Sequence, residues 1–385
     1  MLHVKSSTPI QPSDLSLDTY FPSSKLVLFD GGLGTTLEDV LDLKLAESSL
    51  WSAQPIVDNP ETMVAAHTLF LEAGSTIIST STYQCSFETF GNEGVDAENA
   101  AAIMVRAAND RHVSEGRNFL ALSLGPFGAT LKPTQEFHGC YHPPYGPRKY
   151  VQDGENLNSF GRDLGLEQDA TDALTEFHLN RLTVFSKDAK TWDAIDCIAF
   201  ETIPLRREVR AIRKAMACLE EMVLGPERKR AKPWWISCVF PQGESPEEAF
   251  PGGPKVQIEG LLEACFSRGD THAWPVPSAF GINCTALEYI PSLVTKVRRY
   301  LKDFKSEDLP WLVLYPNGSH IFDEAKQKWI KDGGKESWAE ALSKMVSHIL
   351  IQEVKGRALG GVIVGGCCKT TPSDIAALRQ LAFEV

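Results

Sequence analysis

Short, nearly continuous hydrophobic runs recur along the whole chain, separated by segments in which hydrophobic residues return every three or four positions. Runs of the first kind, rich in Val and Ile, are typical of parallel strands buried on both faces. Segments of the second kind are typical of amphipathic helices. We count eight strand-like runs: 25–30, 75–82, 119–124, 196–201, 234–240, 279–284, 311–315 and 361–365.

The helix predicted before the second run shows the helical pattern most clearly. Asn59 and Pro60 form an N-cap followed by proline at the first helical position, and Gly74 is placed to end the helix. One apolar stripe follows from Met63, Ala66, His67, Phe70 and Leu71. Further helices are expected at 97–113, 168–187, 207–222, 257–267, 286–302 and 337–353. A last helix is expected from Thr371-Pro372, with Ile375, Leu378 and Leu381 on one face.

Eight strands that alternate with helices predict an α/β fold, a single (β/α)₈ TIM barrel over residues 25–385 after an N-terminal extension, 1–24. The main alternative, a doubly wound open sheet, usually carries G-x-G-x-x-G after its first strand. Residues 31–34, Gly-Gly-Leu-Gly, do not fit that motif. Two long irregular segments, 126–165 and 241–257, follow predicted strands, so we expect both at the C-terminal mouth of the barrel.

The charge and composition narrow the classes of partner. A net charge of −12 and a pI of about 5.3 argue against binding to nucleic acid, and the short basic run at 228–232 suits a solvated loop. The sequence contains no stretch of about 18 apolar residues, so no membrane span is predicted. Residues 1–10 lack the apolar core of a secretion signal. Nine cysteines, an odd number, favour a reducing, cytoplasmic setting with thiols free or bound to metal. A homo-oligomer is left open.

Three cysteines fall where barrel active sites are built. Cys284 ends the sixth run, and Cys367 and Cys368 end the eighth, so all three are expected at the mouth. Three protein thiolates with an open fourth position are typical of catalytic zinc. The alternative is that the cysteines are small buried hydrophobes, which suits Cys197, Cys218, Cys238 and Cys265. The spacing alone leaves both interpretations of the mouth cysteines open.

Several motifs, in order along the chain, resemble the homocysteine S-methyltransferase family. They are Asp30-Gly31-Gly32, Thr80–Gln84, Gly125–Gly128, Glu201–Pro204, Gly281–Cys284, Tyr315–Asn317 and Gly365–Cys368, and they span about residues 25–382. The resemblance implies one Zn²⁺ per chain on Cys284, Cys367 and Cys368, and methylation of homocysteine to methionine. Residues 318–320 depart from the family's Ser-Gly-Glu, and 134–137 match its Gly-Ser-Glu-Tyr only loosely, which leaves the methyl donor less determined.

This zinc site suits the chemistry of thiol methylation. A free thiol has a pKa of about 8.5 and is mostly protonated at neutral pH, whereas a thiol bound to zinc is deprotonated. Four thiolates around Zn²⁺ carry a formal charge of minus two, which makes the substrate sulfur nucleophilic and attracts a cationic donor. The transfer then needs alignment rather than a general base.

Carboxylates and glycines at strand ends are candidates for binding the amino acid. Asp30 and Glu201 are expected to pair with the ammonium group of homocysteine, although either residue also suits a structural role. Gly31 and Gly32 are candidates to offer backbone N–H groups to its carboxylate, or to form a tight turn. Glu136 is a further candidate for binding the donor.

The donor and the activity both have alternatives. S-methylmethionine and S-adenosylmethionine are sulfonium donors, whereas betaine, a quaternary ammonium, requires an aromatic cage; Phe127, Phe137, Tyr141 and Tyr145 are candidates for its rings. An inactive zinc-binding barrel that acts as a sensor or scaffold is the alternative to an enzyme. His138, His142, His178 and His320 lack metal-binding spacing, so we expect exposed or packing roles for them.

Overall fold

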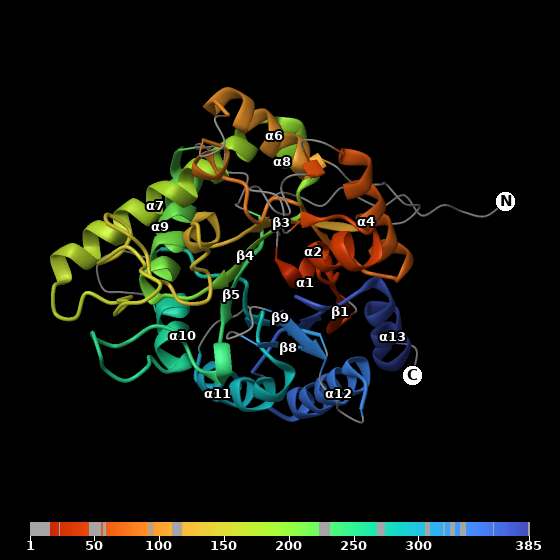
Figure 1. The fold of residues 1–385 in the computed structure, drawn as a ribbon. Helices are drawn as coiled ribbons and strands as arrows, with labels where there is room; N and C mark the ends of the chain where they lie inside the picture. Colours follow the sequence, from red (N-terminus) through yellow and green to blue (C-terminus); the bar gives the residue numbers. More distant parts are fainter. Residues whose placement is uncertain are drawn as a thin grey trace.

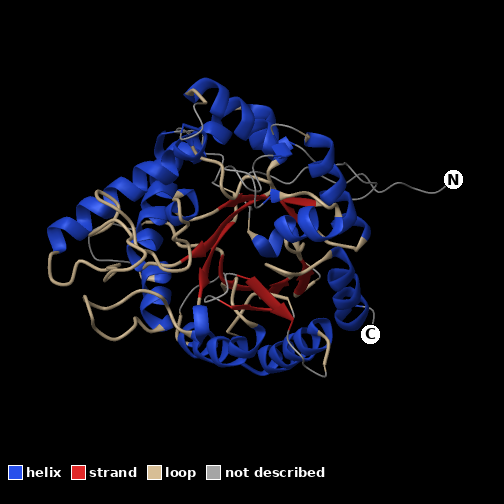
Figure 2. Ribbon diagram, in the orientation of Figure 1, coloured by secondary structure: helices blue, strands red, loops and turns tan. Residues whose placement is uncertain are grey.

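Eight parallel strands form a nearly closed barrel that is surrounded by helices (Figures 1 and 2). The computed structural model describes residues 16–22, 24–45, 55–56, 59–91, 95–109, 118–222, 232–267, 274–304, 309–318, 320–323, 328–331, 336–356 and 358–383. The strand order is β1-β10-β7-β6-β5-β4-β3-β2. A hydrogen bond from Thr76 N to Leu28 O, 2.8 Å long, joins β1 to the residue before β2. The predicted (β/α)₈ barrel is confirmed.

Seven of the predicted runs contain one barrel strand each, and the strand in the run predicted at 196–201 extends two residues beyond it, to Ile203. The strands are β1 (Leu26–Leu28), β2 (Ile77–Ser79), β3 (Phe119–Leu124), β4 (Cys197–Ile203), β5 (Trp234–Val239), β6 (Ala279–Asn283), β7 (Trp311–Tyr315) and β10 (Val362–Val364). All neighbours in the sheet pair in parallel. The strand in 75–82 is shorter than its apolar run because the residues after Ser79 turn into the mouth of the barrel.

The main helices lie outside the barrel (Figure 2). They are α4 (Pro60–Glu72), α6 (Ala97–Asn109), α7 (Leu164–Lys187), α9 (Arg206–Met222), α10 (Ile258–Phe266), α11 (Ile290–Lys302), α12 (Trp338–Gly356) and α13 (Pro372–Phe383). Shorter helical segments are α1 (Leu17–Tyr20), α2 (Leu33–Thr35), η1 (Thr36–Val40), α5 (Phe87–Gly91), η4 (Phe127–Thr130), α8 (Ala189–Ala194), η5 (Pro241–Gly243) and η6 (Leu287–Tyr289).

Several helix details differ from the predictions. α7 begins at Leu164 because the Asp163 side chain accepts a hydrogen bond from Leu166 N. The helix predicted over 286–302 is divided into η6 and α11. Asn59 is the N-cap of α4 and Pro60 begins the helix, as predicted, although the Asn59 side chain makes no cap bond. On α13, Ile375 and Leu378 are buried and Leu381 is 40% exposed. Residues 110–113 of a predicted helix and 228–231 of the basic run lie outside the described residues.

A two-stranded hairpin was not predicted. It consists of β8 (His320–Asp323) and β9 (Lys328–Lys331), which pair antiparallel and form a sheet separate from the barrel. No helix in the described part of the chain is long and apolar enough to span a membrane.

The barrel has one filled end and one open end. Inside it, the Phe29 ring meets Trp235 and Tyr315 at ring-centroid distances of 5.9 and 5.4 Å. At the N-terminal ends of the strands, Phe21 packs against Phe119 and Trp311. Phe21, Phe119 and Trp311 fill the N-terminal end of the barrel. The cavity for a ligand lies at the C-terminal ends of the strands.

The two long irregular segments are ordered by buried polar contacts. Asn158 Nδ2 donates to Pro246 O, and Asn158 Oδ1 accepts from Glu248 N, which ties the two segments together. The buried carboxylate of Glu208 accepts hydrogen bonds from Phe127 N and the Tyr141 hydroxyl. These bonds give the mouth a defined rim.

Candidate active site

One cavity at the C-terminal ends of the strands collects all eight site residues suggested by the sequence. Its volume is about 170 Å³. The wall comes mainly from β4 and from the segments that follow β1, β2, β6 and β10, together with the segment around residue 136. The lining includes Asp30, Gly31, Gly32, Glu136, Glu201, Cys284, Cys367 and Cys368.

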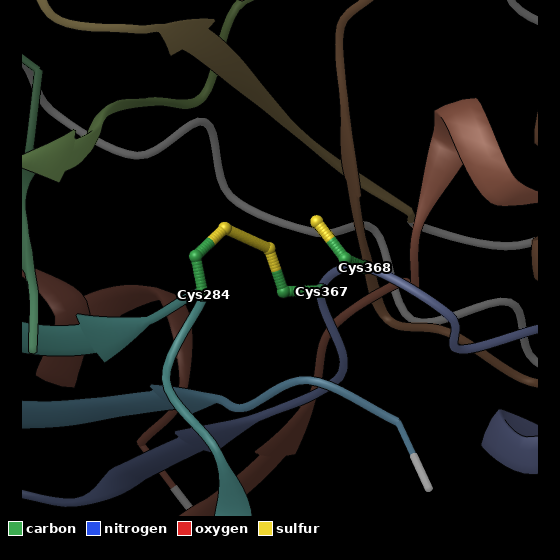
Figure 3. Close-up of side chains that lie close together, drawn as sticks. All are labelled: Cys284, Cys367 and Cys368. Carbon is green, nitrogen blue, oxygen red and sulfur yellow. A yellow bond between two sulfur atoms is a disulfide. The ribbon is translucent and has the colours of Figure 1, made fainter. Parts of the chain in front are cut away.

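Three cysteine sulfurs converge on this cavity from two strand ends (Figure 3). Cys284 follows β6, and Cys367 and Cys368 follow β10 after a glycine pair. All three sulfur atoms lie within 4.8 Å of one another. The sulfurs of Cys284 and Cys367 are joined as a disulfide, with Cα atoms 5.5 Å apart, and Cys368 is free.

A glycine lets this segment approach β1 closely. A Cβ atom at Gly365 would collide with Asp30 O. The neighbouring Gly366 N donates to the same carbonyl oxygen, at 2.9 Å. The backbone after β10 therefore lies directly against Asp30 in the segment that follows β1, which brings Cys367 and Cys368 to the cavity.

The three thiols suit a zinc ion in type and spacing. Zn–S bonds of about 2.3 Å in a tetrahedral site place ligand sulfurs about 3.8 Å apart, so small side-chain rotations would bring these atoms to that geometry. Burial raises the pKa of the Cys368 thiol to about 12, and a bound cation would deprotonate it at neutral pH. Since a ligating sulfur must be a thiolate, the disulfide between Cys284 and Cys367 has to be reduced before both can bind metal.

Cysteines elsewhere behave as packing residues. Cys197, Cys238 and Cys265 are buried in the hydrophobic core, and Cys218 is half-buried on α9. The mouth cysteines form the one group of three or more potential metal ligands found in the described ranges.

The histidines take the roles expected of them where their side chains are described. His178 is fully buried and pairs with Glu208 at 3.1 Å, so it packs rather than ligates. His138 is exposed, and the His142 ring bonds to Pro143 O. The side chain of His320 lies outside the described residues.

Asp30 and Glu201 bring two carboxylates into the cavity from β1 and β4. Asp30 is 3% exposed, and its Oδ2 accepts hydrogen bonds from both N and Oγ of Ser79, each 2.7 Å long. Burial raises the pKa of Asp30 to about 7. Glu201 Oε1 is buried with no hydrogen-bond partner, and burial followed by the nearby charge of Asp30 raises the pKa of Glu201 to about 8. A ligand cation would stabilise both carboxylates.

A β-bulge directs Glu201 into the mouth. Phe200 pairs with Ile236, but Ile203 pairs with Cys238, so two residues of β4 stand opposite one residue of β5. The second of these two, Thr202, has a φ of 59°. A bulge of this kind bends a strand and changes the direction of its side chains.

The two glycines after Asp30 differ in their surroundings. Gly32 N already donates to Thr370 O and Thr370 Oγ1, so its N–H is used within the protein rather than free for a substrate. A Cβ atom at Gly32 would collide with Cys367 O, which explains why glycine is needed there. Gly31 lines the cavity, as do Leu33 and Gly34 at the start of α2, where the first N–H groups of a helix lack partners inside it.

The wall of the cavity also holds a carboxylate–phenol pair. The Tyr83 hydroxyl donates to Glu136 Oε2 at 2.6 Å. Burial raises the pKa of the Glu136 carboxyl, although its bond to Tyr83 opposes the shift. Tyr83, Glu38 and Lys369 also line the cavity, although none of them was predicted from the sequence. Tyr83 lies within one of the family-like motifs, residues 80–84, and that motif was the one feature of the sequence that could have indicated a role for it at the site.

The four rings considered for an aromatic cage are not brought together at this site. Phe127 and Tyr141 are buried in a separate cluster with Phe177, and Tyr145 stacks on Phe127 at 3.8 Å. Of the four, only Phe137 lines the cavity. The others are held away because the segment after η4 folds back against α7.

Comparison with known proteins adds a family assignment. The family model described as homocysteine S-methyltransferase matches residues 27–382. Homocysteine S-methyltransferase 1 of Arabidopsis thaliana is 29% identical over 366 residues, which cover 91% of each chain. Homocysteine S-methyltransferase of Escherichia coli (strain K12) is 28% identical over 92% of this chain and 94% of its own. Selenocysteine Se-methyltransferase of Brassica oleracea is 27% identical over 92% of this chain and 88% of its own.

A solved structure has the same fold. The metallated form of the homocysteine methyltransferase MmuM from Escherichia coli aligns with a TM-score of 0.64 at 22% identity. The alignment covers 96% of this chain and 99% of that one.

Proposed function

The chain belongs to the homocysteine S-methyltransferase family, and from this premise we propose that it is a zinc-dependent enzyme that methylates homocysteine with a sulfonium donor. The products are methionine and the demethylated donor. The observation that carries the proposal is the convergence of three cysteine sulfurs with two buried carboxylates in one cavity. We assign the reaction to the barrel, residues 25–385, and to the cytoplasm, where thiols stay reduced.

Cys284, Cys367 and Cys368 are the proposed zinc ligands. Three soft thiolates select zinc over hard ions such as magnesium. Zinc held by these thiolates would keep the homocysteine sulfur deprotonated and electron-rich at neutral pH. The cysteines approach from two strand ends on one side of the cavity, so they also fix where that sulfur lies.

Asp30 and Glu201 are the proposed anchors for the ammonium group of homocysteine. Both carboxylates are buried, and one oxygen of Glu201 has no partner in the structure. An ammonium group between them would offset their repulsion and supply the missing hydrogen bond. Ser79 holds Asp30 in place through two short hydrogen bonds. The substrate carboxylate is assigned to the backbone N–H groups of Gly31, Leu33 and Gly34, which line the cavity.

Two anchors explain why a homocysteine-like substrate is selected. The sulfur is fixed at the cysteines and the ammonium group at the carboxylates, so the substrate must carry both groups at a set separation. A simple thiol would occupy only the first anchor. The same two contacts orient the sulfur for attack, which is catalysis by proximity and orientation.

The methyl transfer itself requires no proton transfer. The homocysteine thiolate forms a bond to the methyl carbon as the bond from that carbon to the donor's sulfonium breaks, and the bonding pair remains on the departing sulfur as a neutral thioether. The donor loses its positive charge in this step. Glu136 and Glu38 in the cavity wall favour the approach of a cation. We assign Glu136, positioned by Tyr83, to donor binding.

The cavity favours a sulfonium over betaine. A quaternary ammonium is recognised by surrounding aromatic rings, but three of the four candidate rings pack elsewhere. S-methylmethionine and S-adenosylmethionine both remain consistent with the site. An inactive scaffold is disfavoured because buried carboxylates with raised pKa values destabilise a fold and are typical of functional sites.

A donor panel tests the proposal. Reduced, zinc-loaded protein is incubated with homocysteine and, in separate reactions, S-methylmethionine, S-adenosylmethionine, betaine or methyltetrahydrofolate, and methionine is quantified by mass spectrometry. We expect methionine with one or both sulfonium donors. Methionine formed with betaine alone would overturn the donor assignment, and no methionine from zinc-loaded protein would favour the scaffold alternative.

A further inference from the structure

Asn283 and Thr202 link the ends of β4 and β6 through buried hydrogen bonds that reach the sulfur of Cys284. We propose that these two side chains are positioning residues for Cys284, holding its sulfur in place and donating hydrogen bonds to it as a thiolate. The inference rests on the proposed zinc site. It deepens that proposal, because it assigns residues that control one ligand without being ligands themselves.

The side-chain donors of this link point toward the sulfur. Asn283 Nδ2 donates to Thr202 Oγ1 at 2.8 Å and lies 3.5 Å from Cys284 Sγ as a second donor contact. Thr202 Oγ1 in turn donates its own proton to Cys284 Sγ at 3.7 Å. A thiolate is a much better acceptor than a thiol or a disulfide sulfur. Two donors aimed at one sulfur therefore suit its metal-binding state.

Asn283 also fixes the backbone at both strand ends. Its Oδ1 accepts from Thr202 N at 2.9 Å, and its side chain is fully buried. Thr202 and Cys284 have φ values of 59° and 47°, in the left-handed region that is unfavourable for a side chain and most of all for β-branched Thr. Such conformations persist only where surrounding contacts hold them. The bonds from Asn283 to Thr202 supply contacts of that kind.

The same link connects the zinc site to the substrate site. Thr202 lies directly after Glu201 in the β4 bulge, and Cys284 lies directly after Asn283. A shift of one strand end would therefore move both the sulfur and the carboxylate. This arrangement explains how one side chain keeps the two substrate anchors at a set separation.

Thr285 provides a matched control on the other side of Cys284. Both threonines are 1% exposed. The Thr285 hydroxyl donates to Asn283 O and accepts from Phe240 N, so it bonds to backbone groups rather than to the sulfur. Replacing either Thr with Val removes one buried hydroxyl beside Cys284 at similar volume, but only Thr202→Val removes a donor to the sulfur.

The test measures the metal site directly, without relying on turnover. The zinc Kd of reduced full-length protein is determined by competition with a chromophoric chelator. The cobalt-substituted protein reports on the sulfur through its thiolate-to-cobalt charge-transfer band. We expect Thr202→Val to weaken zinc binding by about tenfold to a hundredfold and to shift the band to lower energy. Thr202→Ser, which keeps the hydroxyl, should restore both values, and Thr285→Val should leave both near wild type.

Three outcomes would overturn the inference. One is a wild-type zinc Kd and an unshifted band in Thr202→Val. Another is an equal loss in Thr202→Val and Thr285→Val, which would indicate general packing. Failure of the wild-type protein to bind zinc would overturn the proposed function itself, and with it this role. Asn283→Ala is a second variant that should weaken zinc binding at least as much as Thr202→Val. If this variant fails to fold, the comparison of Thr202→Val with Thr285→Val still tests the inference.

Discussion

Asp30 and Glu201 face the same cavity from β1 and β4, and the charge of Asp30 adds to burial in raising the pKa of Glu201 to about 8. Burial is the main cause of the raised pKa of Asp30, which is about 7. Two ionised carboxylates in this position repel each other and lose hydration. The pair is therefore most stable as anions when a cation lies between them, which is what the ammonium group of homocysteine would provide.

Glu201→Gln tests this ammonium anchor. The change keeps the shape of the side chain and removes its charge, so we expect the KM for homocysteine to rise by about tenfold to a hundredfold, the equivalent of one charge-assisted hydrogen bond. kcat should also fall if the contact helps to align the sulfur. Zinc content, measured by metal analysis, should not change. A simple thiol without an amino group is the control, since both proteins should methylate it poorly and equally. An unchanged KM for homocysteine would assign Glu201 a structural role.

The raised pKa of Glu201 predicts that wild type and Glu201→Gln differ in stability by an amount that depends on pH. A carboxyl with a raised folded-state pKa binds its proton more tightly in the folded protein, so its contribution to stability is present below pH 4.5 and is lost as the pH rises to about 8. Glu201→Gln should therefore gain stability relative to wild type over that window, by about 2–4 kcal/mol at its upper end. Urea unfolding of reduced protein in the presence of a zinc chelator measures the difference. A gap that does not grow with pH would contradict the raised pKa.

The three mouth cysteines should each be required for zinc. Cys284→Ala, Cys367→Ala and Cys368→Ala should each lose most of the one zinc ion expected per chain, because two thiolates hold the metal far more weakly than three. Activity should be lost with it. Cys238→Ala is the matched control, since Cys238 is fully buried in the core and outside the group of three. Full zinc in any of the three mouth variants would remove that residue from the ligand set.

Oxidation should compete with metal binding at the same sulfurs. Peroxide in the presence of a chelator should join Cys284 to Cys367, lower the number of free thiols from nine to seven, and abolish activity. Reductant followed by zinc should restore activity, whereas zinc alone should not. Peptide mass spectrometry identifies the linked cysteines. Activity that resists peroxide under chelating conditions would argue against a thiolate site.

Glu136→Gln should affect the donor rather than the acceptor. Removing this charge from the cavity wall should raise the KM for the sulfonium donor by about tenfold, with a much smaller change in the KM for homocysteine. Tyr83→Phe, which removes the hydroxyl that positions Glu136, should change the donor KM in the same direction by a smaller factor. Steady-state kinetics with each substrate varied in turn separates the two effects. Equal changes in both KM values would show that Glu136 does not discriminate between the two subsites.

The barrel and its mouth were predictable from local sequence. Buried parallel strands need nearly continuous apolar runs, and that requirement is visible without any tertiary information. A barrel also places the end of every strand at one mouth, so the positions of Cys284, Cys367 and Glu201 at the ends of their runs were enough to predict a shared cavity. The hairpin of β8 and β9 was missed because short strands outside the barrel lack that pattern.

The individual contacts in the site depended on the tertiary structure. Gly32 uses its N–H on Thr370, more than 300 residues away, and Phe127 and Tyr145 turn toward α7 rather than toward the cavity. The link from Asn283 to Thr202 likewise joins residues 81 positions apart. Hydrogen bonds and ring packing act over a few ångströms, and residues so far apart in the chain come that close only once the barrel has formed. The sequence by itself determined which chemical groups reach the mouth, and the folded chain decided which of them are free to meet a substrate.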